Sequence, residues 1–366
     1  MEKVIKNFIT INHYQYITAY LLNNVLKFDN SDYEKNTTGL IIRYVSYINT
    51  FELNFEKPSL IFESIPLPTI VYQLFMNNLK NLIEGKLNLE EPEEMIKDNK
   101  NYLLINKDVI LNEKKDKLKY MFDYEIDKYH FMSNDIIDKR MNDNLFMENS
   151  IFYGLMYETE KEVVDKSLKF IKTVSTNNIK ILSFISLSLC MYYCKMYMRT
   201  KDNLYKSSKW LIMITNYLME MNYEGLNLKD KKKFMFMLIK YMGMEFINFD
   251  YKSLLQLNEC YCTDINDTVM NKAGNTGDQI FLLSYYIIRN SLNWNHLKYH
   301  LLMMYHELKM VSVIVGWFYF MMKPNSKMYI YHKIIEKDGK KRDGGKRIKN
   351  EEIKMYSNFL EKIIYK

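Results

Sequence analysis

The sequence is poor in the residues that interrupt regular secondary structure. Its 366 residues include only 11 glycines and 5 prolines, which is about half the usual share of glycine and less than about a third of that of proline. A β-sandwich or β-barrel needs many tight turns, and tight turns depend on these two residues. The shortage therefore excludes collagen-like and proline-rich classes and argues against an all-β fold. Helix is expected to dominate.

Cysteines and long apolar runs are scarce as well. Four cysteines are too few for a disulfide scaffold, and no secretory leader is recognisable, so we expect buried thiols in an intracellular, reducing compartment. This compartment could be the cytoplasm, a viral particle or an organelle. The longest uncharged stretches, Ile181 to Cys194 and Val311 to Met322, span 14 and 12 residues. Since a bilayer span needs roughly 20 residues, we expect buried core helices and no membrane partner.

The remaining composition is that of a folded protein. Hydrophobic residues make up 48% and charged residues 26% of the chain, so wholesale disorder is excluded. The excess of tyrosine (31) and methionine (26) is typical of coding by an AT-rich genome. A methionine and aromatic stripe over residues 181–247 predicts core helices. The same stripe could also accept a protein partner or a second copy of the chain.

Positive charge is concentrated in one short segment near the C-terminus. The formal net charge of the chain is +7, and the segment Lys337 to Lys349, named the basic segment below, carries +5 of it because seven basic residues stand against two aspartates. The seven are Lys337, Lys340, Lys341, Arg342, Lys346, Arg347 and Lys349. Glycines in this segment predict a flexible, solvated loop. It could bind the phosphates of DNA or RNA, or it could be a solvated loop tip without a partner.

Hydrophobic periodicity predicts an α+β, mainly α chain. Apolar residues are spaced as in helices over residues 3–28, 74–87 (with a C-cap at Gly85), 151–173, 178–198, 203–222, 229–247, 278–291, 294–322 and 351–365. Strands are expected at residues 40–48, at Thr69 to Tyr72 and at Met328 to Ile335, where β-branched and aromatic residues gather. The charged, Asn-rich region Asn88 to Lys117 is expected to be irregular.

The change of periodicity near residue 150 predicts three parts. Residues 1–150 are expected to form a small α+β lobe, and residues 151–325 a helical lobe. Residues 326–366 are expected to add a strand, the basic segment and a terminal helix.

One region resembles a known family. Residues 58–89 resemble the core of the ParB/sulfiredoxin-like nucleases found in modification-dependent restriction enzymes of the GmrSD type. The matching residues are Leu60, Ile61, Glu63, Ser64, Pro66, Pro68, Leu79, Leu82, Gly85, Lys86 and Leu89. A fainter likeness extends over about residues 40–245 and implies a ParB-like α+β domain followed by a helical lobe.

The sequence departs from this family at the catalytic motif. In the family an Asp-Gly-Gln-Gln-Arg motif stands between the proline strand and the next helix, but here Tyr72, Gln73 and Leu74 take its place. Without the carboxylate and the arginine, neither a metal nor a phosphate is held for hydrolysis. Gln73 and Arg43 are candidate relics of the pocket. The resemblance therefore implies a descendant that no longer catalyses hydrolysis.

No other motif predicts a metal or a cofactor. His296 and His300 are spaced as two ligands on one helix face, but no third ligand follows within reach, so we expect no metal site and no cofactor. Two interpretations remain. The chain is either a non-catalytic ParB-like scaffold that binds nucleic acid or protein, or an assembly subunit of a viral or organellar complex. Enzymatic activity is the third and least supported interpretation.

Overall fold

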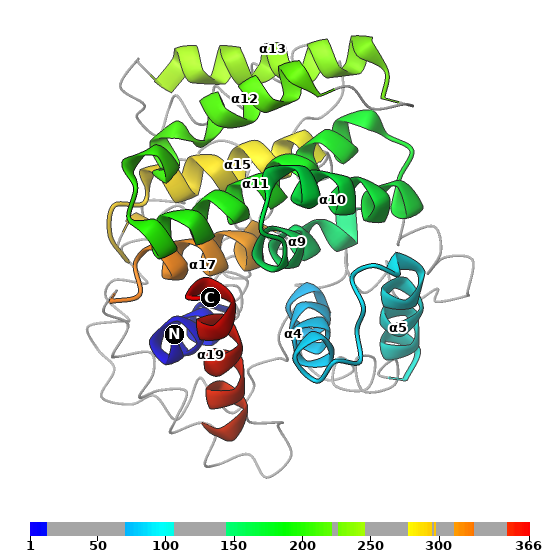
Figure 1. The fold of residues 1–366 in the computed structure, drawn as a ribbon, viewed down its shortest axis with the longest axis vertical. Coiled ribbons are helices and arrows are strands. Elements are labelled where there is room, and N and C mark those ends of the chain that lie inside the picture. The colour runs from blue at the N-terminus through cyan, green and yellow to red at the C-terminus, as the bar shows by residue number, and fades with distance from the viewer. Residues whose placement is uncertain are drawn as a thin grey trace, which may run out of the picture.

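Figure 1 shows the fold in a computed structural model of the chain. The described residues are 1–12, 70–105, 144–221, 226–245, 277–294, 296–297, 311–325 and 350–366. The expected strands at 40–48 and 328–335, Arg43 and the basic segment lie outside these residues. Their structure therefore stays a prediction.

The described residues form helices and contain no strand. Residues 2–12 form an N-terminal helix. The other elements are α4 (Ile70–Ile83), α5 (Pro92–Ile105), η1 (Asn144–Asn149), α9 (Ser150–Met156), α10 (Glu160–Val174), α11 (Asn178–Thr200), η2 (Asn203–Tyr205), η3 (Ser207–Lys209), α12 (Trp210–Glu220), α13 (Leu228–Glu245), α15 (Gly277–Asn290), α17 (Val311–Met322) and α19 (Asn350–Ile364). The mainly helical prediction is confirmed, whereas none of these described residues contributes a strand to an α+β lobe.

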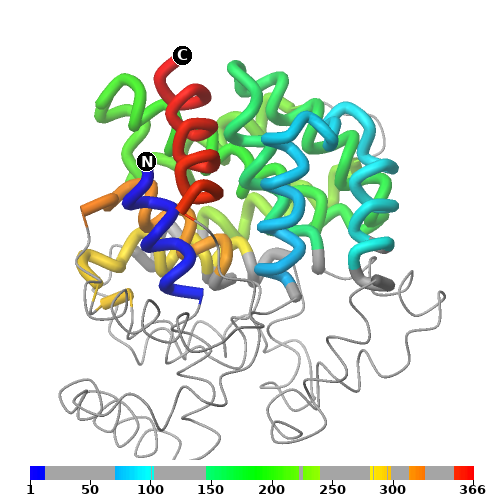
Figure 2. Tube along the Cα trace, turned by 90° about the horizontal axis from the view of Figure 1, so that it is seen from below, coloured from blue at the N-terminus to red at the C-terminus, as the bar shows by residue number. Residues whose placement is uncertain are grey.

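α11 runs through the middle of the described fold. It packs against α9, α10, α13, α15 and α17 (Figure 1). At one end, α12 and α13 lie side by side as an outer layer, and at the opposite end lie the N-terminal helix, α4, α5 and α19. The two ends of the chain come together, as Figure 2 shows, and the Met1 amino group pairs with Glu361 of α19 at 3.3 Å.

The burial of α11 follows from its sequence. Among the described residues it is the one helix long and apolar enough to cross a membrane, with a mean hydropathy of 1.3 over its most apolar window, and 89% of that window is buried inside the fold. The hydroxyls of Ser183, Ser186 and Ser188 donate to carbonyls one turn back, at 2.8, 2.7 and 3.0 Å. These bonds satisfy the hydroxyls without a partner from another helix. The stretch Ile181 to Cys194 is thus a core helix, as expected.

The expected strand Thr69 to Tyr72 is wrong, because Ile70 to Tyr72 form the first turn of α4. Val71, Phe75 and Leu79 recur at helical spacing, and all three are buried. The ring of Phe75 stacks on Phe152 of α9 at 4.8 Å. The preference of β-branched residues for strands spans only about 1 kcal/mol, so the burial of this helical face outweighs it.

The region after α4 also differs from its prediction. The helix ends at Ile83, and Gly85, expected as its C-cap, follows with a φ of 67° and donates its N–H to the Leu82 carbonyl at 3.2 Å. The region Asn88 to Lys117, expected to be irregular, contains α5. Its start carries ordinary helix signals: Pro92 occupies the first position and Glu93 the first turn. These local signals favour a helix in spite of the charge of the region.

Two expected helices are interrupted. The helix at 151–173 breaks after Met156, because Thr159 and Glu162 form a capping box that starts α10: the Glu162 N–H donates to Thr159 Oγ1 at 3.2 Å, and the Thr159 N–H to Glu162 Oε2 at 3.1 Å. The helix at 203–222 begins as two short 3₁₀ turns, and α12 starts at Trp210. The bounds of α11, α13, α15 and α19 match the prediction to within about two residues.

Candidate functional site

Of the residues predicted for a functional site, Gln73 lies in a described segment. It occupies α4, is half buried, and accepts a long hydrogen bond of 3.5 Å from the Tyr102 hydroxyl of α5. Its neighbours Tyr72 and Leu74 are buried at 3% and 0% exposure. The position of the missing family motif is therefore part of a packed helix rather than the rim of an open pocket. Arg43 and the basic residues stay predictions.

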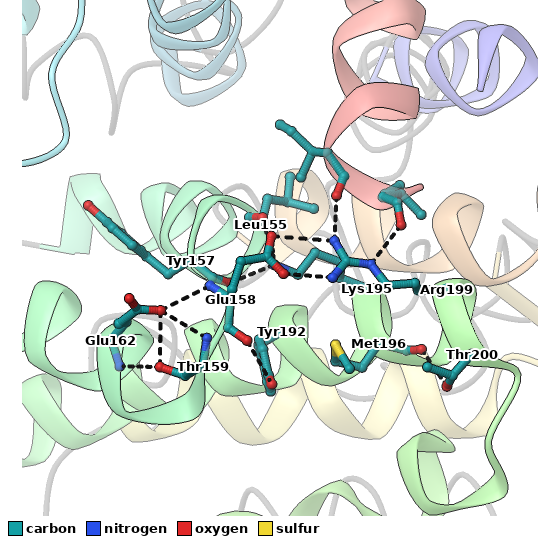
Figure 3. Close-up of polar contacts among 12 residues, drawn as sticks. Leu155, Tyr157, Glu158, Thr159, Glu162, Tyr192, Lys195, Met196, Arg199 and Thr200 are labelled. Carbon is teal, nitrogen blue, oxygen red and sulfur yellow. Dashed lines mark hydrogen bonds and ion pairs between the residues drawn. The ribbon is translucent and has the colours of Figure 1, made fainter. Parts of the chain in front are cut away.

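A dense polar site lies instead where α9 ends and α10 begins (Figure 3). Lys195 and Arg199 of α11 are spaced i, i+4, so both side chains leave the same face of the helix. The Lys195 side chain is fully buried. Its Nζ donates to the carbonyl oxygens of Leu155 at 3.0 Å and Tyr157 at 2.5 Å. Lys195 thus satisfies carbonyls that α9 leaves without helical partners.

Arg199 likewise donates to the carbonyl end of a helix, here one from the far end of the chain. Its Nε and Nη2 donate to the carbonyls of Ile364 at 3.0 Å and Ile363 at 2.9 Å, in the last turn of α19. Its Nη1 donates to Glu158 Oε2 at 2.6 Å. One planar guanidinium therefore joins α19 to the loop between α9 and α10, a geometry that arginine provides and lysine does not.

Glu158 is the shared acceptor of both cations. Its Oε1 lies 3.5 Å from Lys195 Nζ, and its side chain is 54% exposed. The hydrogen bond from Arg199, helped by the nearby charge of Lys195, lowers the pKa of Glu158 below its ordinary value. The carboxylate is therefore charged at neutral pH and offsets part of the cost of burying Lys195.

Burial dominates the ionisation of Lys195. Desolvation of the ammonium lowers its pKa from 10.5 to about 8, although the charge of Glu158 acts in the opposite direction. Between pH 8 and 10 the unfolded chain therefore binds more protons at this position than the folded chain does. The stability contributed by this residue therefore rises with pH in that window, and it is lowest and constant below about pH 8, where both states are protonated.

This linkage gives a measurable pH dependence. We expect the stability of the wild type, relative to Lys195→Met, to rise by about 2 kcal/mol between pH 8 and 10, since each pKa unit is worth about 1.4 kcal/mol. The measurement is urea unfolding of both proteins at each pH. The contributions of tyrosines and exposed lysines to the pH dependence are the same in both proteins and cancel in the difference. A constant difference between the two proteins would show that Lys195 keeps an ordinary pKa.

A second carboxylate extends the site towards α4 and α5. Glu90, in the loop between these helices, accepts from the Tyr157 hydroxyl at 2.9 Å and pairs with Lys166 of α10. Lys169 of α10 donates to the Glu90 carbonyl at 2.6 Å. Because Tyr157 also accepts from Lys195 through its backbone, the polar site is continuous from the α4 to α5 loop to the end of α19.

The same arrangement recurs at two other helix ends. Lys231 donates to the carbonyl of Met221 after α12 at 2.6 Å, and Lys323 donates to those of Ser291 and Leu292 after α15 at 2.5 and 2.7 Å. Helix ends are commonly satisfied by a glycine in a left-handed turn. In a chain with so few glycines, lysine and arginine side chains from neighbouring helices take that role.

In this polar site Lys195 and Arg199 bind the carbonyl ends of helices. A nucleophile or general base must reach its substrate, whereas Lys195 Nζ is enclosed by carbonyls. Other titratable groups of the described core are also enclosed: burial raises the pKa of Glu148 well above its usual range, and Cys190 and Cys194 are buried free thiols with raised pKa values, as expected. No group of three metal-ligating residues occurs in the part of the chain that the structure describes.

Sequence reasoning missed Lys195, Arg199 and Glu158. The available signal was the pair of isolated charges, four residues apart, at the end of an otherwise apolar helix. Nothing in the sequence indicated their partners, because Arg199 lies 41 residues from Glu158 and 165 from Ile364. Compared with known proteins, the chain matches no family model, no curated protein and no solved structure, so the role of this site rests on its own geometry.

Proposed function

We propose that this protein is a non-catalytic helical scaffold that associates with nucleic acid through the basic segment. The observation that carries the proposal is the charge distribution, with +5 of the net +7 in 13 residues. A cluster of lysines and arginines binds phosphates without reading bases. The helical body would then serve as a fixed support for this segment.

The structure supports the non-catalytic part of the proposal in two ways. Where the resembled family carries its catalytic motif, this chain has a packed turn of α4, with the Tyr72 ring 5.8 Å from that of Phe8. The strongest polar site, around Glu158, is occupied by helix ends. Descent from a ParB-like nuclease, with an α+β lobe in residues 1–150, remains part of the proposal on the match at residues 58–68, although Ile70 to Tyr72 depart from it by being helical.

Removing the basic segment's charge is the test of this proposal. Replacing five of its residues by serine should weaken binding to a random duplex for all sequences alike, and should flatten the salt dependence, since each neutralised phosphate contributes a slope of roughly −0.9. The five are Lys340, Lys341, Arg342, Lys346 and Arg347. Fluorescence anisotropy at low and moderate salt measures both effects.

A matched variant controls for net charge. It removes five exposed lysines of the described helices and loops, namely Lys97, Lys161, Lys206, Lys354 and Lys362, and should bind almost as the wild type does. Equal affinity of the wild type and the basic-segment variant would eliminate this segment as a nucleic-acid contact.

An assembly subunit is the second candidate, and one observation favours it. Large apolar side chains of the outer layer are exposed, among them Ile212 at 48% and Met219 at 62% in α12. By contrast, Met191 and Met198 of α11 and Met237 of α13 are buried, so methionine mainly fills the core. Size-exclusion chromatography after nuclease treatment separates the candidates: a salt-resistant oligomer supports the subunit, and nucleic acid that co-purifies only at low salt supports the scaffold.

A further inference from the structure

The outer side of α13 mixes exposed apolar and basic residues. Its apolar members are Leu228, Phe236 and Ile239, exposed at 62%, 68% and 52%. Its basic members, Lys229, Lys232 and Lys233, are exposed as well. At 3.6 residues per turn these six positions fall within an arc of about 140°, in which lysines and apolar side chains are intermixed. This set is called the α13 outer face below.

The rest of α13 is fixed to the body of the protein. Phe234 is buried and its ring lies 6.0 Å from Phe281 of α15. Leu238, one helical turn further along, is also buried. Lys231 donates to Met221 at the end of α12, at 2.6 Å. The inner side of the helix is therefore packed against the rest of the fold. α13 lies at one end of the described fold (Figure 1), and the side chains of its outer face are exposed.

We propose that the α13 outer face binds an anionic lipid surface. Phenylalanine, isoleucine and leucine side chains enter the boundary between headgroups and acyl chains, while lysines beside them bind the acidic headgroups. The lysine stems are long enough to lie along the apolar boundary with the ammonium in water.

The side-chain types favour lipid over other partners. Protein interfaces are enriched in arginine and depleted of lysine, and all three charges of this face are lysines. A second copy of the same face would bring Lys229, Lys232 and Lys233 against their equivalents, which repel. A nucleic acid would use the lysines but would leave Leu228 and Ile239 without a role, because aliphatic side chains offer no stacking surface.

The inference goes beyond the proposed function and does not depend on it. It departs from the expectation of no membrane partner, which rested on the length needed to span a bilayer and not on binding at its surface. The basic segment and α13 are far apart in the sequence, so each can be removed without the other. A variant lacking the five charges of the basic segment should lose duplex binding and keep binding to anionic vesicles. The loss of one activity therefore does not imply the loss of the other.

Co-sedimentation of the full chain with vesicles tests the proposal. The vesicles contain phosphatidylcholine with about a third phosphatidylserine, or phosphatidylcholine alone. We expect binding to the first kind only. Since each lysine near an acidic surface contributes about fivefold, replacing Lys229, Lys232 and Lys233 by serine should weaken binding about 100-fold. The double variant Phe236→Ser/Ile239→Ser should weaken it at least about tenfold.

A matched variant replaces three exposed lysines elsewhere, Lys97, Lys161 and Lys362, by serine and should bind as the wild type does. Circular dichroism and thermal melting confirm that each variant is folded. Absence of wild-type binding at low salt would overturn the proposal. So would equal weakening by the two triple variants. Self-association of the wild type that is lost in Phe236→Ser/Ile239→Ser, without vesicle binding, would instead identify the face as a protein interface.

Discussion

Replacing Gly154 by alanine is expected to destabilise the fold by more than about 3 kcal/mol. A Cβ at this position of α9 would lie 2.3 Å from the Ser188 carbonyl oxygen, 2.5 Å from Met191 Cβ and 2.8 Å from the Tyr192 nitrogen. Two of these atoms belong to the backbone of α11, so the helices would have to separate. The gain of about 1 kcal/mol from replacing a helical glycine is too small to compensate. Urea unfolding measures the change.

Gly316 of α17 provides the matched control. A Cβ there would lie 2.9 Å from Ile11 Cγ2, and a side-chain atom can move where a backbone carbonyl cannot. Gly316→Ala should therefore cost no more than about 1 kcal/mol, because the helix propensity gained offsets the tight contact. If both variants were equally stable, α9 and α11 would not cross as closely as this structure has them.

Replacing Arg199 by methionine is expected to cost about 2–3 kcal/mol, the second-largest effect. The change removes the hydrogen bonds to Ile363 and Ile364 and the pairing with Glu158. Partial exposure of Glu158 keeps the loss below that of a fully buried ion pair. Lysine at this position should recover only part of the loss, because an ammonium cannot reach all three acceptors in one plane.

Hydrogen exchange locates this effect. In Arg199→Met the amides of the last turn of α19 should exchange faster, whereas those of α13, which accepts none of the Arg199 hydrogen bonds, should be unchanged apart from the global loss of stability. A double-mutant cycle with Glu158→Gln measures the coupling between the two side chains. If the losses of stability in the two single variants were additive, and if amide exchange in α19 were unchanged, the role given to Arg199 would be contradicted.

The sequence predicts helices correctly where local signals and burial agree. α11, α13, α15 and α19 were predicted because their apolar residues recur at helical spacing, and the end of α4 was predicted from Gly85. The strand at Thr69 to Tyr72 was wrong because β-branched residues bias the backbone only weakly. There, contact with Phe8 and Phe152, distant in the sequence, decides the conformation.

The polar site around Glu158 could not be predicted from the sequence, for a different reason. Periodicity places Lys195 and Arg199 on one face of a helix, but it does not say which helix ends they meet. Those partners come from α9 and α19, and only the fold brings them together. A lysine in an apolar helix could equally have faced solvent. In a glycine-poor chain, isolated charges in apolar helices are candidates for binding the carbonyl ends of other helices.

The central claim is binding to nucleic acid without cleavage. Its most direct test incubates the full chain with a labelled random duplex and Mg²⁺ at low salt, releases the DNA at high salt, and analyses it on a denaturing gel. The proposal predicts that the duplex is bound, that binding weakens steeply with salt, and that the recovered strands are intact at every time point. Metal-dependent cleavage that is lost on Gln73→Ala would contradict it, as would a duplex that never binds.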